Sequence, residues 1–205
     1  MRTIVFATHK GGCGKSSLAT SLADAARDAG ESVAIFDLDP KNCASRWGSK
    51  RMDRTLPVRP LESARLPRAL NGASKHKVTL VIIDTPALES SATLAAVKAA
   101  DLTIVPTRPS IFDIWVAEVT GRRMTLIGEK FLFLLNQCPP RSQSRRIQKC
   151  IAALEAAGPL VAPQIGTSQK FLEAAEKGKG VTEIDRKGRA AEEIRSLWFA
   201  IKRSL

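Results

Sequence analysis

The chain has 205 residues, of which 44% are hydrophobic, enough to build one buried core of ordinary domain size. Its 32 Lys and Arg against 20 Asp and Glu give a formal charge of +12, which suits a polyanionic partner and equally a solvated basic surface. The four cysteines, Cys13, Cys43, Cys138 and Cys150, are widely separated, which excludes a CxxC zinc site. No signal peptide is visible, and no stretch approaches the roughly 20 apolar residues of a spanning helix, so we expect a cytoplasmic protein.

Apolar runs of strand length alternate with helical patterns in a βαβ rhythm. We predict strands at residues 3–8, 32–36, 80–83, 102–105 and 131–135. We predict helices at residues 14–29, 91–100, 111–127, 144–157, 168–177 and 190–202, and basic loops at 139–142 and 178–188. The fold class is therefore α/β, a doubly wound and mostly parallel sheet with helices on both faces, in a single domain spanning residues 1–205.

Between the first predicted strand and the first predicted helix lies a glycine-rich segment, His9-Lys10-Gly11-Gly12-Cys13-Gly14-Lys15-Ser16-Ser17. In that context glycines let backbone N–H groups turn toward an anion, and the helix N-terminus adds its unsatisfied donors. Lys15 is expected to reach the β- and γ-phosphates, and Ser16 to offer its hydroxyl to Mg²⁺. The segment predicts binding of ATP with Mg²⁺.

The loop departs from the usual G-x-x-x-x-G-K-[ST], because His9 occupies the first glycine position and Lys10 follows it. The residues KGGCGKSS resemble the deviant Walker A loop, xKGGxxK[ST], of the ParA/MinD superfamily of P-loop ATPases. This resemblance implies that Lys10 crosses an ATP-sandwiched dimer interface and contacts the nucleotide of the other subunit. It makes nucleotide ligands of the whole run Lys10, Gly11, Gly12, Cys13, Gly14, Lys15, Ser16 and Ser17.

Two further segments fit the same family in the same order. Asp37-Leu38-Asp39-Pro40 is similar to its DxDP segment, in which the second aspartate orients the attacking water, so Asp39 takes that role by position beside the catalytic Lys10 and Lys15. Asp84, at the end of an apolar run, resembles the Walker B aspartate that holds Mg²⁺ through water. The implied metal site comprises Ser16, Asp39 and Asp84. Without the resemblance, the Asp-x-Asp-Pro segment can be only a turn.

The resemblance also extends to the adenine base. Asn136 follows the predicted strand at 131–135, where the family has an adenine-contacting Asn, and its amide can pair with the adenine edge. Pro163 resembles the second wall of the base pocket. Each position can also be an ordinary strand-end turn.

Nearly the whole chain looks like the short ParA/ParF-type partition ATPases. The chain begins directly at the first strand, so we expect no N-terminal helix-turn-helix. Branches that hold iron–sulfur clusters need paired cysteines, and the tyrosine-kinase branch needs tyrosines, of which there are none. The resemblance implies an ATP-dependent homodimer on nucleoid DNA, whose ATP hydrolysis is stimulated by a centromere-binding, ParB/ParG-like partner to segregate plasmid or chromosomal DNA.

Two alternatives stay open. The first is a MinD-like positioning ATPase on a membrane, because residues 190–205 carry apolar side chains at helical spacing beside Arg195, Lys202 and Arg203. A terminal helix of this kind more often packs on the sheet, so we expect no membrane contact. The second is a nucleotide-dependent cargo-positioning scaffold with negligible hydrolysis.

Basic residues concentrate in two segments. Residues 41–77 contain 10 basic and 2 acidic residues, among them Arg46, Arg51, Arg54, Arg59, Arg65 and Arg68. Residues 121–149 add Arg122, Arg123, Arg141, Arg145 and Arg146. Phosphate contacts need only charge and reach, and these segments lack the repeated interleaving of aromatic and basic residues that favours stacking on single strands. We predict ATP-dependent, salt-sensitive binding to double-stranded DNA without sequence preference.

Overall fold

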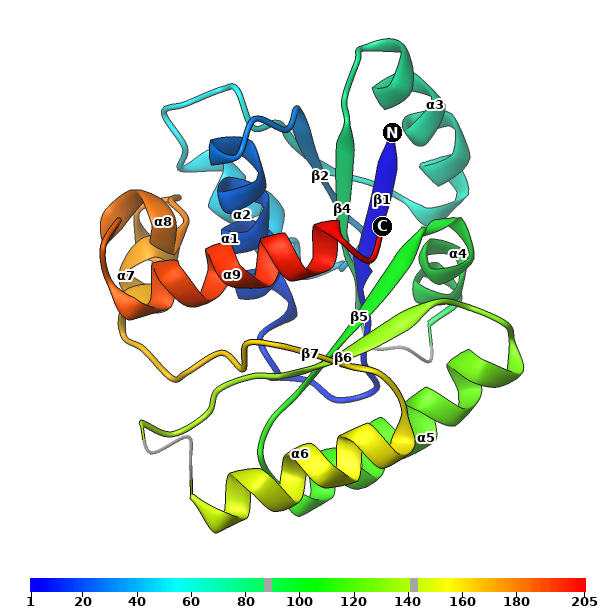
Figure 1. Cartoon of the computed structure of the whole chain (residues 1–205). Helices are drawn as coiled ribbons and strands as arrows, with labels where there is room; N and C mark the ends of the chain where they lie inside the picture. Colours follow the sequence, from blue (N-terminus) through cyan, green and yellow to red (C-terminus); the bar gives the residue numbers. More distant parts are fainter. Residues whose placement is uncertain (87–89, 141–143) are drawn as a thin grey trace.

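The computed structural model describes residues 1–86, 90–140 and 144–205, so Arg141 and Ser142 of the predicted loop at 139–142 lie outside the described residues. The described residues form one sheet of seven strands, all parallel, in the order β3-β2-β4-β1-β5-β6-β7 (Figure 1). The strands are β1 (Arg2–Phe6), β2 (Val33–Asp37), β3 (Val58–Pro60), β4 (Leu80–Asp84), β5 (Leu102–Thr107), β6 (Phe131–Leu135) and β7 (Leu160–Val161). The predicted α/β fold with a parallel sheet is confirmed.

Helices connect the strands and lie on both faces of the sheet. They are α1 (Lys15–Asp28), α2 (Cys43–Ser49), the 3₁₀ turn η1 (Ser63–Arg65), α3 (Leu66–Lys75), α4 (Ser91–Ala99), α5 (Ile111–Leu126), α6 (Arg145–Ala157), α7 (Lys170–Glu176), α8 (Val181–Ile184) and α9 (Arg189–Lys202). All predicted strands and helices are present, and each begins and ends within two residues of its predicted bounds. The short elements α2, β3, η1, α3, β7 and α8 were not predicted.

The strands bury side chains on both faces, as their apolar sequences require. In β1, Ile4 and Phe6 join the core under α1, α2, α7, α8 and α9, while Val5 joins the core under α3, α4, α5 and α6. Figure 1 shows the two helical layers on opposite sides of the sheet. The fold is a three-layer α/β/α arrangement whose connections leave the carboxyl ends of the strands along one edge.

The last helix packs on the sheet, as expected. Its apolar stripe, including Ile194, Leu197, Trp198 and Ile201, is buried in the core beside α1. The stripe that a membrane surface would need is therefore already covered by the protein. Among the described residues, none of the helices combines the length and apolarity needed to cross a bilayer.

The predicted loop at 178–188 is wrong in part, because it contains α8. An ion-pair network that links distant segments holds this turn. Arg51, only 4% exposed, pairs with Glu183 at 2.9 Å, and Thr182 of α8 donates to the buried carboxylate of Asp24 at 2.5 Å. Gly180 N–H donates to Glu183 as well. Arg51 therefore belongs to the interior, which corrects its place among the surface cations of residues 41–77.

Candidate functional site

Three strands deliver polar groups to one edge of the sheet. The register pairs Asp84, at the end of β4, with Phe6 of β1 on one side and Asp37 of β2 on the other. β1 lies between β4 and β5, so the chain connections diverge on either side of it, and ligands of doubly wound sheets bind at such a point. The glycine-rich loop follows β1 at this edge of the sheet, and Lys15 and Ser16 at its end lie near Asp84.

The loop conformation requires glycine at two positions. Gly12 and Gly14 have φ angles of 76° and 92°, in the left-handed region that residues with a Cβ disfavour. A Cβ at Gly14 would also lie 2.5 Å from Nδ2 of Asn136. That amide donates to the Cys13 carbonyl at 2.7 Å, and Nε2 of Gln137 donates to the Gly12 carbonyl at 2.9 Å. Two side chains that follow β6 thus fasten the loop to the sheet.

The loop leads straight into α1, which begins at Lys15. Gly11, Gly12 and Ser17 are exposed, Cys13 is buried, and Lys15 and Ser16 are half-buried. The helix N-terminus and the exposed glycine backbone therefore face solvent together, which is the environment that a phosphate needs.

Asp84 is fully buried, and neither of its carboxylate oxygens has a hydrogen bond of normal geometry in the described residues. Burial raises the pKa of its carboxyl group to about 7, although the nearby Ser16 hydroxyl and Lys15 charge oppose the shift, and Asp37 and Asp39 add to it. A buried carboxylate without a partner is costly unless a cation compensates it. The group therefore fits a site for Mg²⁺.

The donor set agrees with that metal rather than with zinc. The described residues contain no group of three or more His, Cys, Asp or Glu side chains that could hold a metal ion by themselves. Mg²⁺ in nucleotide sites needs only one or two protein ligands, because phosphate oxygens and water complete its coordination. Asp84 and the Ser16 hydroxyl provide such a pair.

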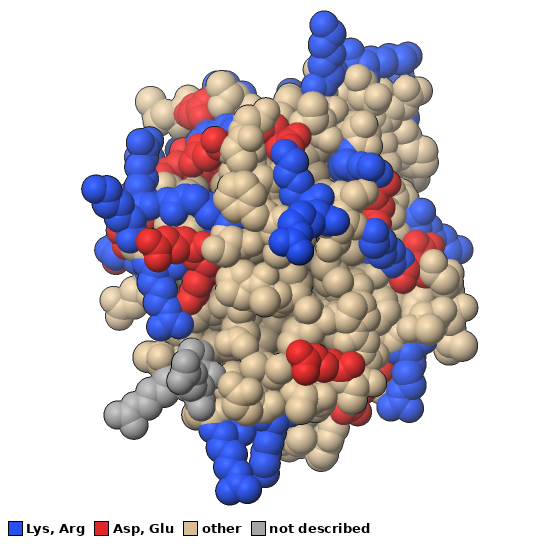
Figure 2. Space-filling model, in the orientation of Figure 1, with Lys and Arg blue, Asp and Glu red and all other residues tan. Residues whose placement is uncertain are grey.

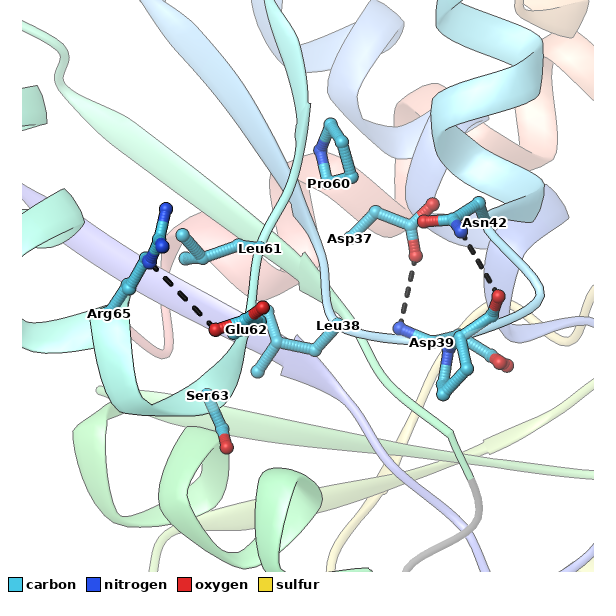
Figure 3. Close-up of a pocket in the computed structure, with 10 residues that line it drawn as sticks. Asp37, Leu38, Asp39, Asn42, Pro60, Leu61, Glu62, Ser63 and Arg65 are labelled. Atoms are coloured by element: carbon cyan, nitrogen blue, oxygen red, sulfur yellow. Dashed lines mark hydrogen bonds and ion pairs between the residues drawn. The ribbon is translucent and has the colours of Figure 1, made fainter.

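Figure 3 shows the segment after β2, where Asp37 and Asp39 have different environments. Asp37 is buried and accepts from the backbone N–H of Asp39 at 3.1 Å and of Ser45 at 2.7 Å, so it fixes the turn and the start of α2. Asp39 is half-exposed and accepts from Lys41 N–H through Oδ1 at 2.9 Å. It borders a cavity of about 530 Å³ that reaches η1. Asp37 is therefore a structural residue, and Asp39 is accessible.

Lys10 does not extend away from the subunit in this state. Its Nζ lies 2.7 Å from Oδ1 of Asp113, in the first turn of α5, and Arg108 pairs with the same carboxylate at 3.1 Å. Burial acts to raise the pKa of Asp113, but the contacts with Lys10 and Arg108 outweigh it and lower the pKa. The sequence analysis did not identify this partner, since nothing in the local pattern links Lys10 to Asp113.

His9 joins the loop to the same helix. Its Nδ1 lies 2.7 Å from Thr120 Oγ1, and its Nε2 lies 2.7 Å from Arg123 Nη1. The residue that replaces the usual first glycine is therefore a side-chain link between the loop and α5. The sequence showed that His9 is unusual at this position, but it did not identify Thr120 and Arg123 as its partners.

A smaller cavity, of about 220 Å³, lies beside the loop at the start of α1. Asn136 lines it together with Gly14, Ser17, Leu18, Gln137, Gly166, Thr167, Ser168, Phe171 and Leu172. Pro163, predicted as a wall of the base pocket, is not among the lining residues. The chain after β7 bridges to Cys138 through Gly166, and this segment lines the cavity with Gly166, Thr167, Ser168, Phe171 and Leu172. Apolar side chains beside the amides of Asn136 and Gln137 suit a flat base.

Known nucleotide-binding proteins resemble this chain over most of its length. The family CbiA, described as the CobQ/CobB/MinD/ParA nucleotide binding domain, matches residues 4–181. The chain is 28% identical over 205 residues to "Maintenance of carboxysome distribution protein A" of Halothiobacillus neapolitanus, covering 95% of this chain and 94% of that protein. A protein of the same name from Gloeobacter kilaueensis is 36% identical over 150 residues, which are 72% of this chain and 68% of that protein. Among solved structures, apo McdA of Cyanthece superposes with a TM-score of 0.80 at 18% identity, over 100% of this chain and 99% of that one.

Proposed function

Because the chain belongs to the CobQ/CobB/MinD/ParA nucleotide-binding family, we propose that it is a ParA-like ATPase that uses MgATP to position a cargo over DNA. The observation that carries the proposal is the unpartnered, buried carboxylate of Asp84 beneath a glycine-rich loop that leads into α1. Two relatives, 28% and 36% identical to this chain, are named for carboxysome distribution. We therefore favour cargo positioning over the plasmid or chromosome segregation expected from the sequence.

The loop, Asp84 and Asn136 have distinct proposed roles in nucleotide binding. The backbone from Lys10 to Ser17 is proposed to surround the phosphates, and Lys15 to neutralise their charge from the start of α1. Asp84 and Ser16 would hold Mg²⁺, which offsets charge on the phosphate oxygens. Asn136 has a further role in our proposal: it holds the loop through Cys13, and its contact with adenine remains a prediction.

Hydrolysis is assigned to Asp39 and to a second copy of the chain. The half-exposed Asp39 carboxylate is proposed to align a water molecule, because positioning is the main demand of phosphoryl transfer. Lys10 is proposed to act across an ATP-dependent homodimer. In that state it must exchange its contact with Asp113 for one with the other subunit, while Arg108 can continue to neutralise the carboxylate.

The proposed DNA surface has fewer available cations than the sequence suggested, since Arg51 is buried. Figure 2 shows Lys and Arg side chains in several separate groups on the visible face, with Asp and Glu among them. One group combines distant segments, because Trp47 donates to the Lys179 carbonyl and Lys50 to that of Glu176. We assign the DNA contacts to its exposed cations, Arg46, Lys50, Arg54, Lys177 and Lys179.

The protein partner is proposed to reside on the cargo, in the place that a centromere-binding protein occupies in DNA partition. Binding to DNA would keep the chain on the nucleoid in the cytoplasm. The membrane alternative loses its main support, because α9 buries the apolar stripe on which it depended.

Release of phosphate from ATP tests the proposal directly. With Mg²⁺ and double-stranded DNA present, we expect slow but measurable turnover by the native chain and at least about tenfold less by Asp39→Ala, since a misplaced nucleophile reacts far more slowly. Nucleotide affinity should be similar in both proteins.

A rate near zero for the native chain, with normal nucleotide binding, would favour the alternative of a scaffold with negligible hydrolysis. Fluorescence anisotropy on labelled duplex DNA completes the test. The affinity should require ATP and fall steeply with salt, because counterions are released from each neutralised phosphate. DNA binding that ignores both nucleotide and salt would contradict the proposal.

A further inference from the structure

Helix α5 carries an apolar face that no part of the described chain covers. The exposed large hydrophobic side chains on and just after this helix are Ile111, Phe112, Trp115, Val119, Leu126 and Ile127. Phe112 is 64% exposed and Trp115 54%, and their rings meet edge to face with centroids 5.6 Å apart. Positions 112, 115 and 119 follow helical spacing, so they form one stripe. Contiguous apolar surface of this kind marks an interaction site more often than a free surface.

A groove runs beside the stripe, between α5 and α6. This α5–α6 groove has a volume of about 540 Å³ and apolar walls from Ile111, Phe112, Ile114, Cys150 and Ala153. Its volume lies within the range of about 300–1,000 Å³ that is typical of binding pockets, so it can accept side chains of a partner. Phe112 belongs to both the groove and the stripe.

The rim of the groove is basic. Arg145, Arg146 and Lys149 line it from α6, and none of the described residues that line it is acidic. In Figure 2 a group of Lys and Arg side chains gathers at the lower end of the molecule, over the start of α6. Arg146 also donates to the Pro109 carbonyl at 2.7 Å, which holds its side chain between the two elements.

Charge decides between the occupants. In a two-fold contact of groove against groove, a second copy of the chain would bring Arg145, Arg146 and Lys149 against the same cations. Duplex DNA would satisfy the cations but leave the apolar groove and Phe112 without contacts. A peptide helix with apolar side chains on one face and carboxylates beside them satisfies both, in the helix-in-groove manner of recognition.

We propose that the α5–α6 groove and the adjoining Phe112–Trp115 stripe dock an acidic amphipathic segment of a partner protein. The docking surface is independent of the proposed function. The partner's role, which is to regulate the nucleotide cycle from the cargo, rests on that function. Helix α5 is the element through which docking can be communicated, because Asp113 holds Lys10 and Thr120 and Arg123 contact His9.

The test uses the full chain and a fluorescein-labelled, 18-residue synthetic peptide, about five turns long, with Leu and Phe on one helical face and Glu along both flanks of that face. A second peptide carries Lys in place of every Glu. Anisotropy titration should show that the Glu peptide binds at least about tenfold more tightly than the Lys peptide. Phe112→Ser and Arg145→Glu should each weaken the Glu peptide at least about tenfold. Phe199→Ser, 60% exposed on α9, and Lys75→Glu on α3 are matched controls and should leave binding within about twofold.

Three outcomes would overturn the proposal. Equal binding by the native chain, Phe112→Ser and Arg145→Glu would show that the peptide does not use the groove. Loss of the ATP-dependent dimer in Phe112→Ser, with nucleotide titration unchanged, would assign the stripe to a second copy. Weaker DNA binding in the two variants, with peptide binding unchanged, would assign it to nucleic acid. Failure of nucleotide binding in the native chain would contradict the proposed function and leave the docking result independent.

Discussion

Asp84 is a carboxyl group that is fully buried, without a hydrogen-bond partner in the described residues. Ionising such a group costs free energy unless a cation lies beside it. Gly14 is required for a different reason. Its left-handed φ angle and the nearby amide of Asn136 leave no room for a Cβ. The proposed binding of MgATP depends on the charge of Asp84 and on the loop conformation at Gly14, and each residue gives a prediction.

Replacing Asp84 should change the pH dependence of stability. Its folded-state pKa of about 7 exceeds the ordinary value of 3.8, so the ionisation penalty is absent below pH 4, grows as the pH rises to 7 and is then constant. Without Mg²⁺ and nucleotide, Asp84→Asn should therefore be more stable than the native chain at pH 8, by up to about 4 kcal/mol, and similar to it below pH 4.

Urea unfolding at both pH values measures this difference. Other titrating groups, such as Asp24, are common to both proteins and cancel in the comparison. MgATP should raise the melting temperature of the native chain and not that of the variant. A constant difference in stability across the pH range would contradict the assignment.

Replacing Gly14 by Ala should distort the loop. The left-handed φ of 92° costs an alanine roughly 1–2 kcal/mol, and its Cβ would collide with Asn136 Nδ2. We expect a loss of at least about 1 kcal/mol in unfolding free energy, measured by thermal denaturation without nucleotide. Gly11→Ala is the control, because a Cβ there meets nothing within 4 Å. Equal losses in the two variants would argue against the required conformation.

How much of the site could be predicted depends on whether the signal is local. The glycines, Lys15, Ser16, Asp39 and Asp84 each lie at or just after the end of a strand or at the start of a helix, positions that are visible in the sequence, and the structure brings them to one edge. The contacts of Lys10 with Asp113 and of Asn136 with Cys13 join segments far apart in the chain. Such contacts follow from the sheet order, which the alternation of elements does not specify.

At the scale of elements, the central strands and six of the helices were predictable, whereas the edge strands β3 and β7 and the elements α2, η1, α3 and α8 were not. β3 contains Arg59 and Pro60 and is an edge strand, so it lacks the continuous apolar run of a central strand. α8 has four residues in a basic, glycine-flanked stretch, and its position depends on Arg51 and Asp24 from other segments. Tertiary contacts rather than local propensity determine these elements.

Arg51 gives the prediction at this scale. It pairs with Glu183, and its guanidinium lies 4.8 Å from the centre of the Trp47 ring. Arg51→Met should leave Arg27 as the main remaining cation beside Asp24 and Glu183 and destabilise the chain by about 2 kcal/mol in urea unfolding. The exposed Arg54→Met should change stability by less than about 0.5 kcal/mol. A milder effect at Arg51 than at Arg54 would contradict the structural role.

At the scale of the whole molecule, the parallel sheet explains why one edge collects the site. Every strand runs in the same direction, so the segments after β1, β2, β4 and β6 meet at their carboxyl ends. The helical layers leave this edge open, while α9 closes the core on one face. The formal charge of +12 of the whole chain attracts polyanions, although buried and paired cations reduce the number available for DNA.

Calorimetric titration of ATP into the native chain is the most direct test of nucleotide capture by this edge. In the presence of Mg²⁺ we predict saturable heat at one nucleotide per chain, a weaker signal when Mg²⁺ is chelated, and at least about tenfold lower affinity for Lys15→Ala. No heat from the folded native chain, or equal affinity in Lys15→Ala, would contradict the account.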